Sequence, residues 1–282
     1  MQVCIGLCVY NNEFGLPYVF KNIERIQTCF KEKIQVVVAY DESPDCSLGI
    51  LLSKLDSFHI HIIKNTKPIT NSRVVNIANS RNQILEFVRE NIPKTTYMIM
   101  IDSNEYACIG EISLDVLKEV FEPDLAKKWD AVSFDREAGY YDHWALSFDP
   151  FIYSFFHTAD FQQTVAKLRE YFEKIMKHAK KTPNELLPVF SAFNGFAIYK
   201  WSVFKDCNYS SEIDISLFPR ELLEKQIQIT GVPFIPNFSG DCEHRHFHLQ
   251  AIREKNARIR IFPKSLFARF QGEKKKDCRG PC

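Results

Sequence analysis

Residues 97–105 read YMIMIDSNE, an apolar run that ends in two carboxylates separated by Ser103 and Asn104. Five mostly apolar residues in succession predict a strand that is buried on both faces of a sheet, as in parallel sheets covered by helices. A second run, IQVVVAY at 34–40, has the same character and is followed by the acidic stretch 41–45. Ligands bind beyond the carboxyl ends of strands in open α/β sheets. The sequence therefore predicts a parallel sheet with acidic side chains along one edge.

The rest of the first hundred residues alternates short apolar runs with amphipathic patterns. Further strands are expected at 2–10 and 58–63, and helices at 16–30, 48–55 and 74–88. Strands that alternate with helices form right-handed βαβ units, so this part of the chain is predicted to be a Rossmann-like α/β structure.

The second half of the chain is less regular. Strands are expected at 130–134, 193–199 and 259–262, and a long charged helix at 161–180. No internal repeat or low-complexity linker divides the sequence, so we expect a single large domain with halves at 1–105 and 106–270. Residues 271–282, which contain the run Lys274–Lys276, are expected to form a disordered basic tail.

The composition is that of a soluble globular protein. The chain has 282 residues, and its 36 Lys and Arg against 35 Asp and Glu give a net charge of +1, which argues against nucleic-acid binding by bulk electrostatics. Nine cysteines follow no disulfide framework, which indicates a reducing compartment. No signal peptide and no apolar run long enough for a transmembrane segment is seen, so a cytoplasmic protein is expected.

Two acidic turns and an arginine are the first candidates for a binding site. Asp41, Ser43 and Asp45 follow a predicted strand and suit either hydrogen bonds to a ribose or base edge or a simple capping turn. Arg81, inside the helix expected at 74–88, suits a phosphate or a strand-end carboxylate. Asp102 and Asn104 carry oxygen ligands of the kind that Mg²⁺ and Mn²⁺ take, and a cation there would bridge two phosphates; the alternative is a capping turn.

A histidine-rich stretch near the end of the chain is another candidate. It reads DCEHRHFH and contains Asp241, Glu243, His244, His246 and His248. If the stretch is extended, all three histidines share one face; if it is helical, the first and the third do. Either geometry offers an imidazole to a metal and a carboxylate to a substrate, and the alternative is that some of these side chains belong to the core.

Four of these segments, taken in order, resemble the nucleotide-sugar-binding half of GT-A fold glycosyltransferases, particularly family 2-like ones. The segments are VCIGLCVYNNE at 3–13, the acidic turn at 41–45, the A-x-x-R-N pattern at 78–82 and a DxD-like motif at 102–104. The resemblance implies a mostly parallel central sheet flanked by helices. It also implies a nucleotide-diphosphate sugar as donor and Mn²⁺ or Mg²⁺ as cofactor.

The same resemblance implies roles for individual residues. Asp41 and Arg81 would grip the nucleoside and the diphosphate, and Asp102 would hold the cation. The second Asp of DxD is replaced by Asn104, a neutral and weaker ligand, so help would come from Glu105 or from a histidine of the DCEHRHFH stretch.

The second half resembles poorly characterised glycosyltransferase-like proteins, including some of large DNA viruses, and the capsule-associated mannosyltransferase-like group. The similar segments are 140–146, 193–196 and 242–244. Acceptor binding is assigned to this half, since aromatic rings pack against the C–H faces of sugars and polar side chains read hydroxyls. The acceptor candidates are Tyr141, Asp142, Trp144, Asn194, Gly195 and Phe196. A virus-encoded protein would act in the host cytoplasm.

The favoured function is therefore a metal-assisted, nucleotide-sugar-dependent glycosyltransferase. Inversion at the sugar is expected, with Asp241 or Glu243 as base, and retention is the alternative. A catalytically degenerate carbohydrate-binding or scaffolding protein of the same fold is the non-enzymatic alternative, because of Asn104. A nucleotidylyltransferase is disfavoured because the loop at 10–15 reads YNNEFG without a glycine-rich phosphate loop, and a dehydrogenase because no GxGxxG follows a strand.

Overall fold

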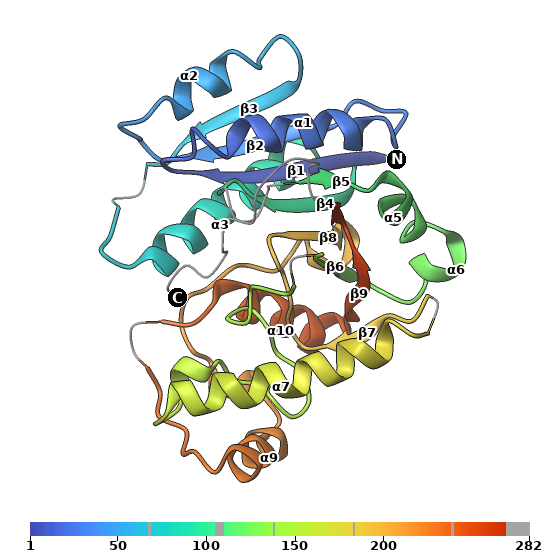
Figure 1. The fold of residues 1–282 in the computed structure, drawn as a ribbon. Coiled ribbons are helices and arrows are strands. Elements are labelled where there is room, and N and C mark those ends of the chain that lie inside the picture. Colours follow the sequence, from blue (N-terminus) through green and yellow to red (C-terminus); the bar gives the residue numbers. More distant parts are fainter. Residues whose placement is uncertain (67–68, 105–109, 138, 183, 238–239, 269–282) are drawn as a thin grey trace.

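A central sheet of eight strands runs through the part of the chain that the computed structural model describes, which is residues 1–66, 69–104, 110–137, 139–182, 184–237 and 240–268 (Figure 1). In spatial order the strands are β3 (His59–Lys64), β2 (Gln35–Tyr40), β1 (Gln2–Val9), β4 (Thr95–Asp102), β8 (Phe196–Lys200), β6 (Ala131–Asp135), β9 (Ile259–Ser265) and β7 (Leu187–Val189). The first four pair in parallel. These are the four strands predicted for the first half, and their parallel arrangement is confirmed.

The second half contributes the mixed part of the sheet. Strand β8 lies antiparallel between β4 and β6, whereas β9 pairs in parallel with β6 and β7 runs antiparallel at the edge. A small separate sheet joins β5 (Glu111–Ile112) to β10 (Phe267–Ala268). The two halves of the chain therefore share one continuous sheet through the β4–β8 pairing.

Helices cover both faces of the sheet (Figure 1). They are α1 (Leu16–Gln27), α2 (Ser47–Leu52), α3 (Arg73–Asn91), α5 (Leu114–Glu119), α6 (Pro123–Ala126), α7 (Phe161–Ala179), α8 (Trp201–Phe204), α9 (Arg220–Thr230) and α10 (Glu243–Lys255), with short 3₁₀ helices η1 (Phe155–His157) and η2 (Ile215–Leu217). Helix α1 packs its apolar stripe into one core, and α3, α7 and α10 pack into the other. Burial of these stripes against the two faces is what stabilises the helices.

The helices α1, α2, α3 and α7 confirm the patterns seen in the sequence, while α5, α6, α8 and α9 were not predicted. The DCEHRHFH stretch, whose conformation the sequence left open, is helical from Glu243 onward. No helix in the described ranges is long and apolar enough to cross a membrane. The predicted tail at 271–282 lies outside the described residues.

Candidate functional site

The carboxyl ends of β1, β2 and β4 lie at one edge of the sheet. In the strand register Val9 is paired with Tyr40, and Cys8 with Asp102. The loop after β2 is tied to β1 because the Asp41 N–H donates to the Val9 carbonyl at 2.9 Å. The polar residues that follow these strands in sequence are thereby gathered in space, as predicted.

Asp41 is held from two sides. Its Oδ1 accepts a hydrogen bond from Asn65 Nδ2 at 2.6 Å, and its Oδ2 accepts one from the Ser80 hydroxyl at 3.3 Å. Asn65 follows β3 and Ser80 lies on α3, next to Arg81. The carboxylate is therefore fixed between two elements and only partly buried, and its contact with a nucleoside stays a prediction.

Ser43 and Asp45 join two loops of this edge. The Ser43 hydroxyl accepts from the Asn11 N–H at 3.0 Å, and the two Asp45 oxygens accept from the N–H groups of Glu13 and Ser47, each at 3.0 Å. Burial by itself would raise the pKa of Asp45, but these hydrogen bonds outweigh it and lower the pKa. In this structure both side chains hold the loop after β1 to the loop after β2, and direct contact with a donor stays a prediction.

Arg81 lies at the centre of the site and is only 4% exposed. One terminal nitrogen donates to Asp102 Oδ1 at 3.0 Å, and the other contacts Glu243 Oε1 and His244 Nε2. Its guanidinium carbon lies 4.8 Å from the centre of the Phe193 ring. Burial alone lowers the pKa of Arg81, but the carboxylates of Glu243 and Asp102 prevail and raise it well above its ordinary value. The contact of Arg81 with a diphosphate stays a prediction, since its terminal nitrogens already have protein partners.

The three histidines of α10 do not form one cluster. His244 stacks on Phe193 at 3.8 Å, and burial, with Arg81 and His248, keeps its pKa well below the ordinary value, so the imidazole is neutral. Both ring nitrogens of His248 are engaged, by the Ser191 hydroxyl at 2.9 Å and by the Tyr199 hydroxyl at 3.2 Å. His246 lies on a different face of the helix, as an α-helical spacing of two requires.

Asp241 and Glu243, the two predicted bases, have different surroundings. Asp241 is buried and accepts from Arg245 Nε at 2.8 Å, and the Nε2 of His157 lies 3.4 Å from its Oδ1. Burial alone would raise the pKa of Asp241, but Arg245 and His157 outweigh it and lower the pKa. Glu243, by contrast, shares Arg81 with Asp102. The structure thus brings Glu243, and not Asp241, into direct contact with Arg81, which also pairs with Asp102.

Among the acceptor candidates, Asn194 and Gly195 shape a turn. Both have positive φ, 56° and 81°, and the Gly195 carbonyl accepts the Asp102 N–H at 3.0 Å. The Asn194 side chain donates to the Phe134 carbonyl at 2.9 Å and accepts from the Tyr141 N–H at 3.1 Å. Asn194 therefore fixes the loop that carries Tyr141, and contact of its amide with sugar hydroxyls stays a prediction.

Asp142 is the titratable group of that loop. Its oxygens accept from the N–H groups of Ala145 at 3.1 Å and Asn194 at 3.3 Å. Burial raises its pKa to about 6; the Ala145 hydrogen bond opposes the rise, and the negative charges of Asp102 and Glu243 add to it. Asp102, Glu243 and Asp142 therefore face one another from three segments of the chain.

The predicted aromatic platforms differ in exposure. Tyr141 is 37% exposed and Trp144 is partly buried, with its ring 5.7 Å from that of Phe156. Phe196 is 1% exposed and packs between Phe134 and Phe267, so its prediction as a sugar platform is wrong. Both faces of this central strand are covered, so the Phe196 ring belongs to one of the two cores.

The residues present fit a cation that is held mainly by diphosphate oxygens and water. The Asp102 side chain is 24% exposed and Asn104 is partly exposed, so both are accessible to solvent. No group of three His, Cys, Asp or Glu side chains within the described residues is arranged to hold a metal. This donor set suits Mg²⁺ or Mn²⁺, which keep several waters and use few protein ligands. Glu105 lies outside the described residues.

Three further side chains of the site were not assigned from the sequence. The rings of Phe193 and Tyr209 are centred 4.8 Å and 5.5 Å from the Arg81 guanidinium carbon, and Asn65 donates a hydrogen bond to Asp41. Tyr209 lies in an irregular segment with no periodic pattern, so sequence gave no signal for it. Phe193 could have been assigned to the site from the sequence, because it directly precedes the Asn194-Gly195 turn.

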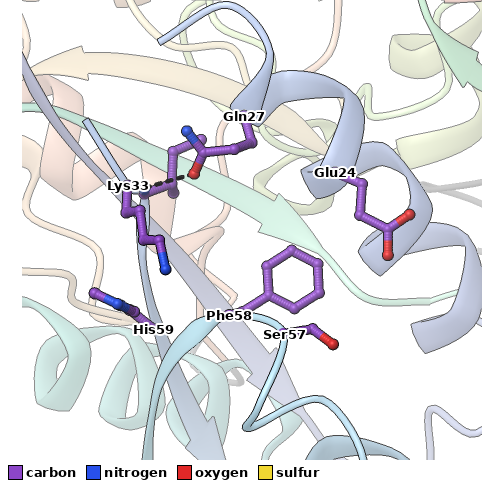
Figure 2. A pocket seen from close by; sticks show the side chains of 7 residues that line it. Glu24, Gln27, Lys33, Ser57, Phe58 and His59 are labelled. Carbon is purple, nitrogen blue, oxygen red and sulfur yellow. Dashed lines mark hydrogen bonds between the residues drawn. The ribbon is translucent and has the colours of Figure 1, made fainter. Parts of the chain in front are cut away.

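A pocket of about 220 Å³ lies at the opposite edge of the sheet. Figure 2 shows its lining, which includes Gln27 near the end of α1, Lys33 before β2, and Phe58 and His59 where β3 begins. These are the amino ends of parallel strands. None of the candidate site residues lines this pocket.

Comparisons with known proteins agree with this architecture. No family model and no curated protein matches the sequence, so nothing supports the predicted similarity to proteins of large DNA viruses. Among solved structures, S. aureus TarS residues 1–349, alone and in complex with UDP, is similar with a TM-score of 0.52 and 15% identity, over 95% of this chain and 59% of that chain. Glucosyl-3-phosphoglycerate synthase from Mycobacterium tuberculosis, in complex with Mn²⁺, UDP and phosphoglyceric acid, gives a TM-score of 0.39 and 9% identity over 72% of this chain and 57% of that chain.

The chain thus has the fold predicted from its sequence, the GT-A glycosyltransferase fold, with a mostly parallel central sheet flanked by helices in a single domain. It spans about three fifths of the TarS chain to which it is similar.

Proposed function

We propose that this protein is a glycosyltransferase that takes its sugar from a nucleoside-diphosphate donor with the help of a divalent cation. The observation that carries the proposal is that Asp102 and Glu243 share the buried Arg81 at the edge of a GT-A sheet where Asp41 follows strand β2. The fold similarity to TarS, which has been solved in complex with UDP, supports the same donor class.

In the proposed site, Asp41 binds the nucleoside, and Asp102 with Asn104 faces the diphosphate and its cation. A divalent cation supplies neutralisation of the charge that develops on the leaving diphosphate. Arg81 forms ion pairs with both Asp102 and Glu243, and its buried positive charge holds the two carboxylates close together. Tyr141, Asp142 and Trp144 form the acceptor side.

We further propose inversion at the sugar, with Glu243 as base. The acceptor hydroxyl gives its proton to the Glu243 carboxylate while its oxygen attacks the anomeric carbon, and the bond to the diphosphate oxygen breaks with the electron pair leaving on the nucleoside diphosphate. Of the two carboxylates predicted for this role, Glu243 contacts Arg81, whereas Asp241 is enclosed by Arg245 and His157. A β-linked product from an α-linked donor, seen by NMR, supports this assignment, and an α-linked product contradicts it.

The test of the function is donor binding and hydrolysis. Titration calorimetry with UDP or GDP and Mn²⁺ should show binding, and Asp102→Ala should lower the turnover of a hydrolysed donor by about 100-fold or more, since it removes the carboxylate nearest the diphosphate. Asp124→Ala is the matched control, because the Asp124 side chain is 99% exposed on α6. Binding of neither nucleotide would favour the non-catalytic scaffold that Asn104 suggests, and full activity of Asp102→Ala would refute the site.

A further inference from the structure

The irregular segment 205–211, between α8 and η2, is hydrogen-bonded to helix α3 at two points, which we call its two fastenings. At one point, Asn82 Nδ2 donates to the Tyr209 carbonyl and Asn82 Oδ1 accepts from the Tyr209 N–H, both at 2.8 Å. At the other, Arg89 donates to main-chain carbonyls of the segment and to Asn208 Oδ1 at 3.1 Å. Asn82 and Arg89 are seven residues apart, so they lie on the same face of the helix.

The fastening at Asn82 places an aromatic ring on Arg81, the preceding residue of the helix. The centre of the Tyr209 ring lies 5.5 Å from the Arg81 guanidinium carbon, and Phe193 covers the guanidinium at 4.8 Å. Tyr209 is itself stacked on Phe247 of α10 at 4.1 Å with an angle of 14°. The guanidinium is thereby excluded from water, which strengthens its interaction with the carboxylates it contacts.

We propose that Asn82 is a positioning residue of the candidate site, which fixes Tyr209 on Arg81 and through Arg81 orients Asp102 and Glu243. The proposal rests on the proposed function for its link to donor binding. An amide is the side chain that can both donate to and accept from one backbone unit. Alanine at this position makes neither hydrogen bond, and aspartate can only accept.

The arrangement gives Arg81 a role that differs from direct binding of the donor. With its terminal nitrogens on protein partners and the rings of Phe193 and Tyr209 centred 4.8 Å and 5.5 Å from its guanidinium carbon, Arg81 acts as an internal counter-charge for Asp102 and Glu243. If Tyr209 moves away, water reaches the guanidinium, and the two carboxylates lose a fixed partner. The consequence for a donor is indirect, because it passes through Asp102, whose side chain is 24% exposed.

The experiment compares Asn82→Ala with Arg89→Ala, since each variant removes one of the two fastenings and only the first is next to Arg81. Calorimetry with UDP and Mn²⁺ is run well below the unfolding temperature of both. We expect Asn82→Ala to weaken UDP binding about tenfold or more and Arg89→Ala to change it by no more than about twofold. Tyr209→Leu should reproduce Asn82→Ala, and it replaces that variant if Asn82→Ala does not fold.

A spectroscopic measurement reports on the position of Tyr209 against Arg81 in the absence of a donor. The ¹⁵N guanidinium signal of Arg81, assigned by its absence in Arg81→Lys, should be shifted by the two rings and exchange slowly with water. Asn82→Ala should abolish both properties and Arg89→Ala should keep them. Equal behaviour of the two variants in binding and in this signal would overturn the proposal. A wild-type protein that binds no UDP, yet loses the signal in Asn82→Ala, would refute the proposed function and leave the positioning role established.

Discussion

Replacement of Gly15 by alanine should destabilise the protein, because the added Cβ would clash with the backbone of the loop after β4. A Cβ on Gly15 would lie 2.0 Å from the Ser103 carbonyl oxygen and 3.2 Å from the Asn104 carbonyl carbon. Contacts of this kind need more than 3 Å, so α1 and the loop after β4 would have to separate by over about 1 Å, and both are backbone. Overpacking of this kind costs about 3 kcal/mol, which corresponds to a fall of about 6–10 °C in the unfolding temperature of a domain of this size.

Thermal unfolding followed by circular dichroism measures the effect. Gly49→Ala is the matched control, because Gly49 lies within helix α2 and no described atom comes within 4 Å of an added Cβ. This control should gain about 0.5–1 kcal/mol from helix propensity. The reasoning about Gly15 would be refuted by a Gly15→Ala protein that unfolds at the wild-type temperature. Since Ser103 follows Asp102, the variant should also bind UDP and Mn²⁺ more weakly.

Two other substitutions test the charges of the site and the core. The pKa of Asp142 is raised from its ordinary value to about 6, so its contribution to stability is fully present below about pH 4 and is lost as the pH rises through 6. Asp142→Asn should therefore raise the unfolding free energy by about 2 kcal/mol at pH 7.5 and by little at pH 4, as urea titrations in the presence of a chelator can measure; an equal effect at both pH values contradicts this. Asp130→Ala removes the carboxylate that accepts from Arg258 Nε at 2.8 Å and Nη2 at 2.9 Å. Because the Arg258 side chain is 43% exposed and screened by water, thermal unfolding should show a loss of about 1–2 kcal/mol, whereas a loss under about 0.5 kcal/mol would show that the pair is ordinary surface charge.

The sheet and its acidic edge were predictable because their signals are local. The run at 34–40 is β-branched and apolar, and the structure buries nearly all of it as β2. Asp41 and Asp102 come directly after such runs, so their meeting at one edge follows from parallel pairing alone. The antiparallel direction of β8 has no such local signal, because it depends on how the chain returns to the sheet after β6.

Only one of the carboxylate partners of Arg81 was among the predicted alternatives. The sequence left open whether Arg81 pairs with a phosphate or with a strand-end carboxylate, and Asp102 is such a carboxylate, whereas Glu243 is 162 residues away along the chain. The histidines of α10 show the same limit. Their spacing predicted that His244 and His248 share a face if the stretch is helical, but Ser191 and Tyr199, which occupy both nitrogens of His248, come from other segments.

The β4–β8 pairing has a consequence for how this chain can be divided. Strand β4 is paired with β1 on one side and with β8 on the other, in register from Tyr97 opposite Lys200 to Ile101 opposite Phe196. A fragment that stops at residue 105 would contain every parallel strand of the first half and yet leave β4 as a bare, apolar edge, open to pairing with other copies. A fragment limited to residues 1–105 is therefore expected to aggregate, because β8, which comes from the second half of the chain, is the strand that covers this edge of β4.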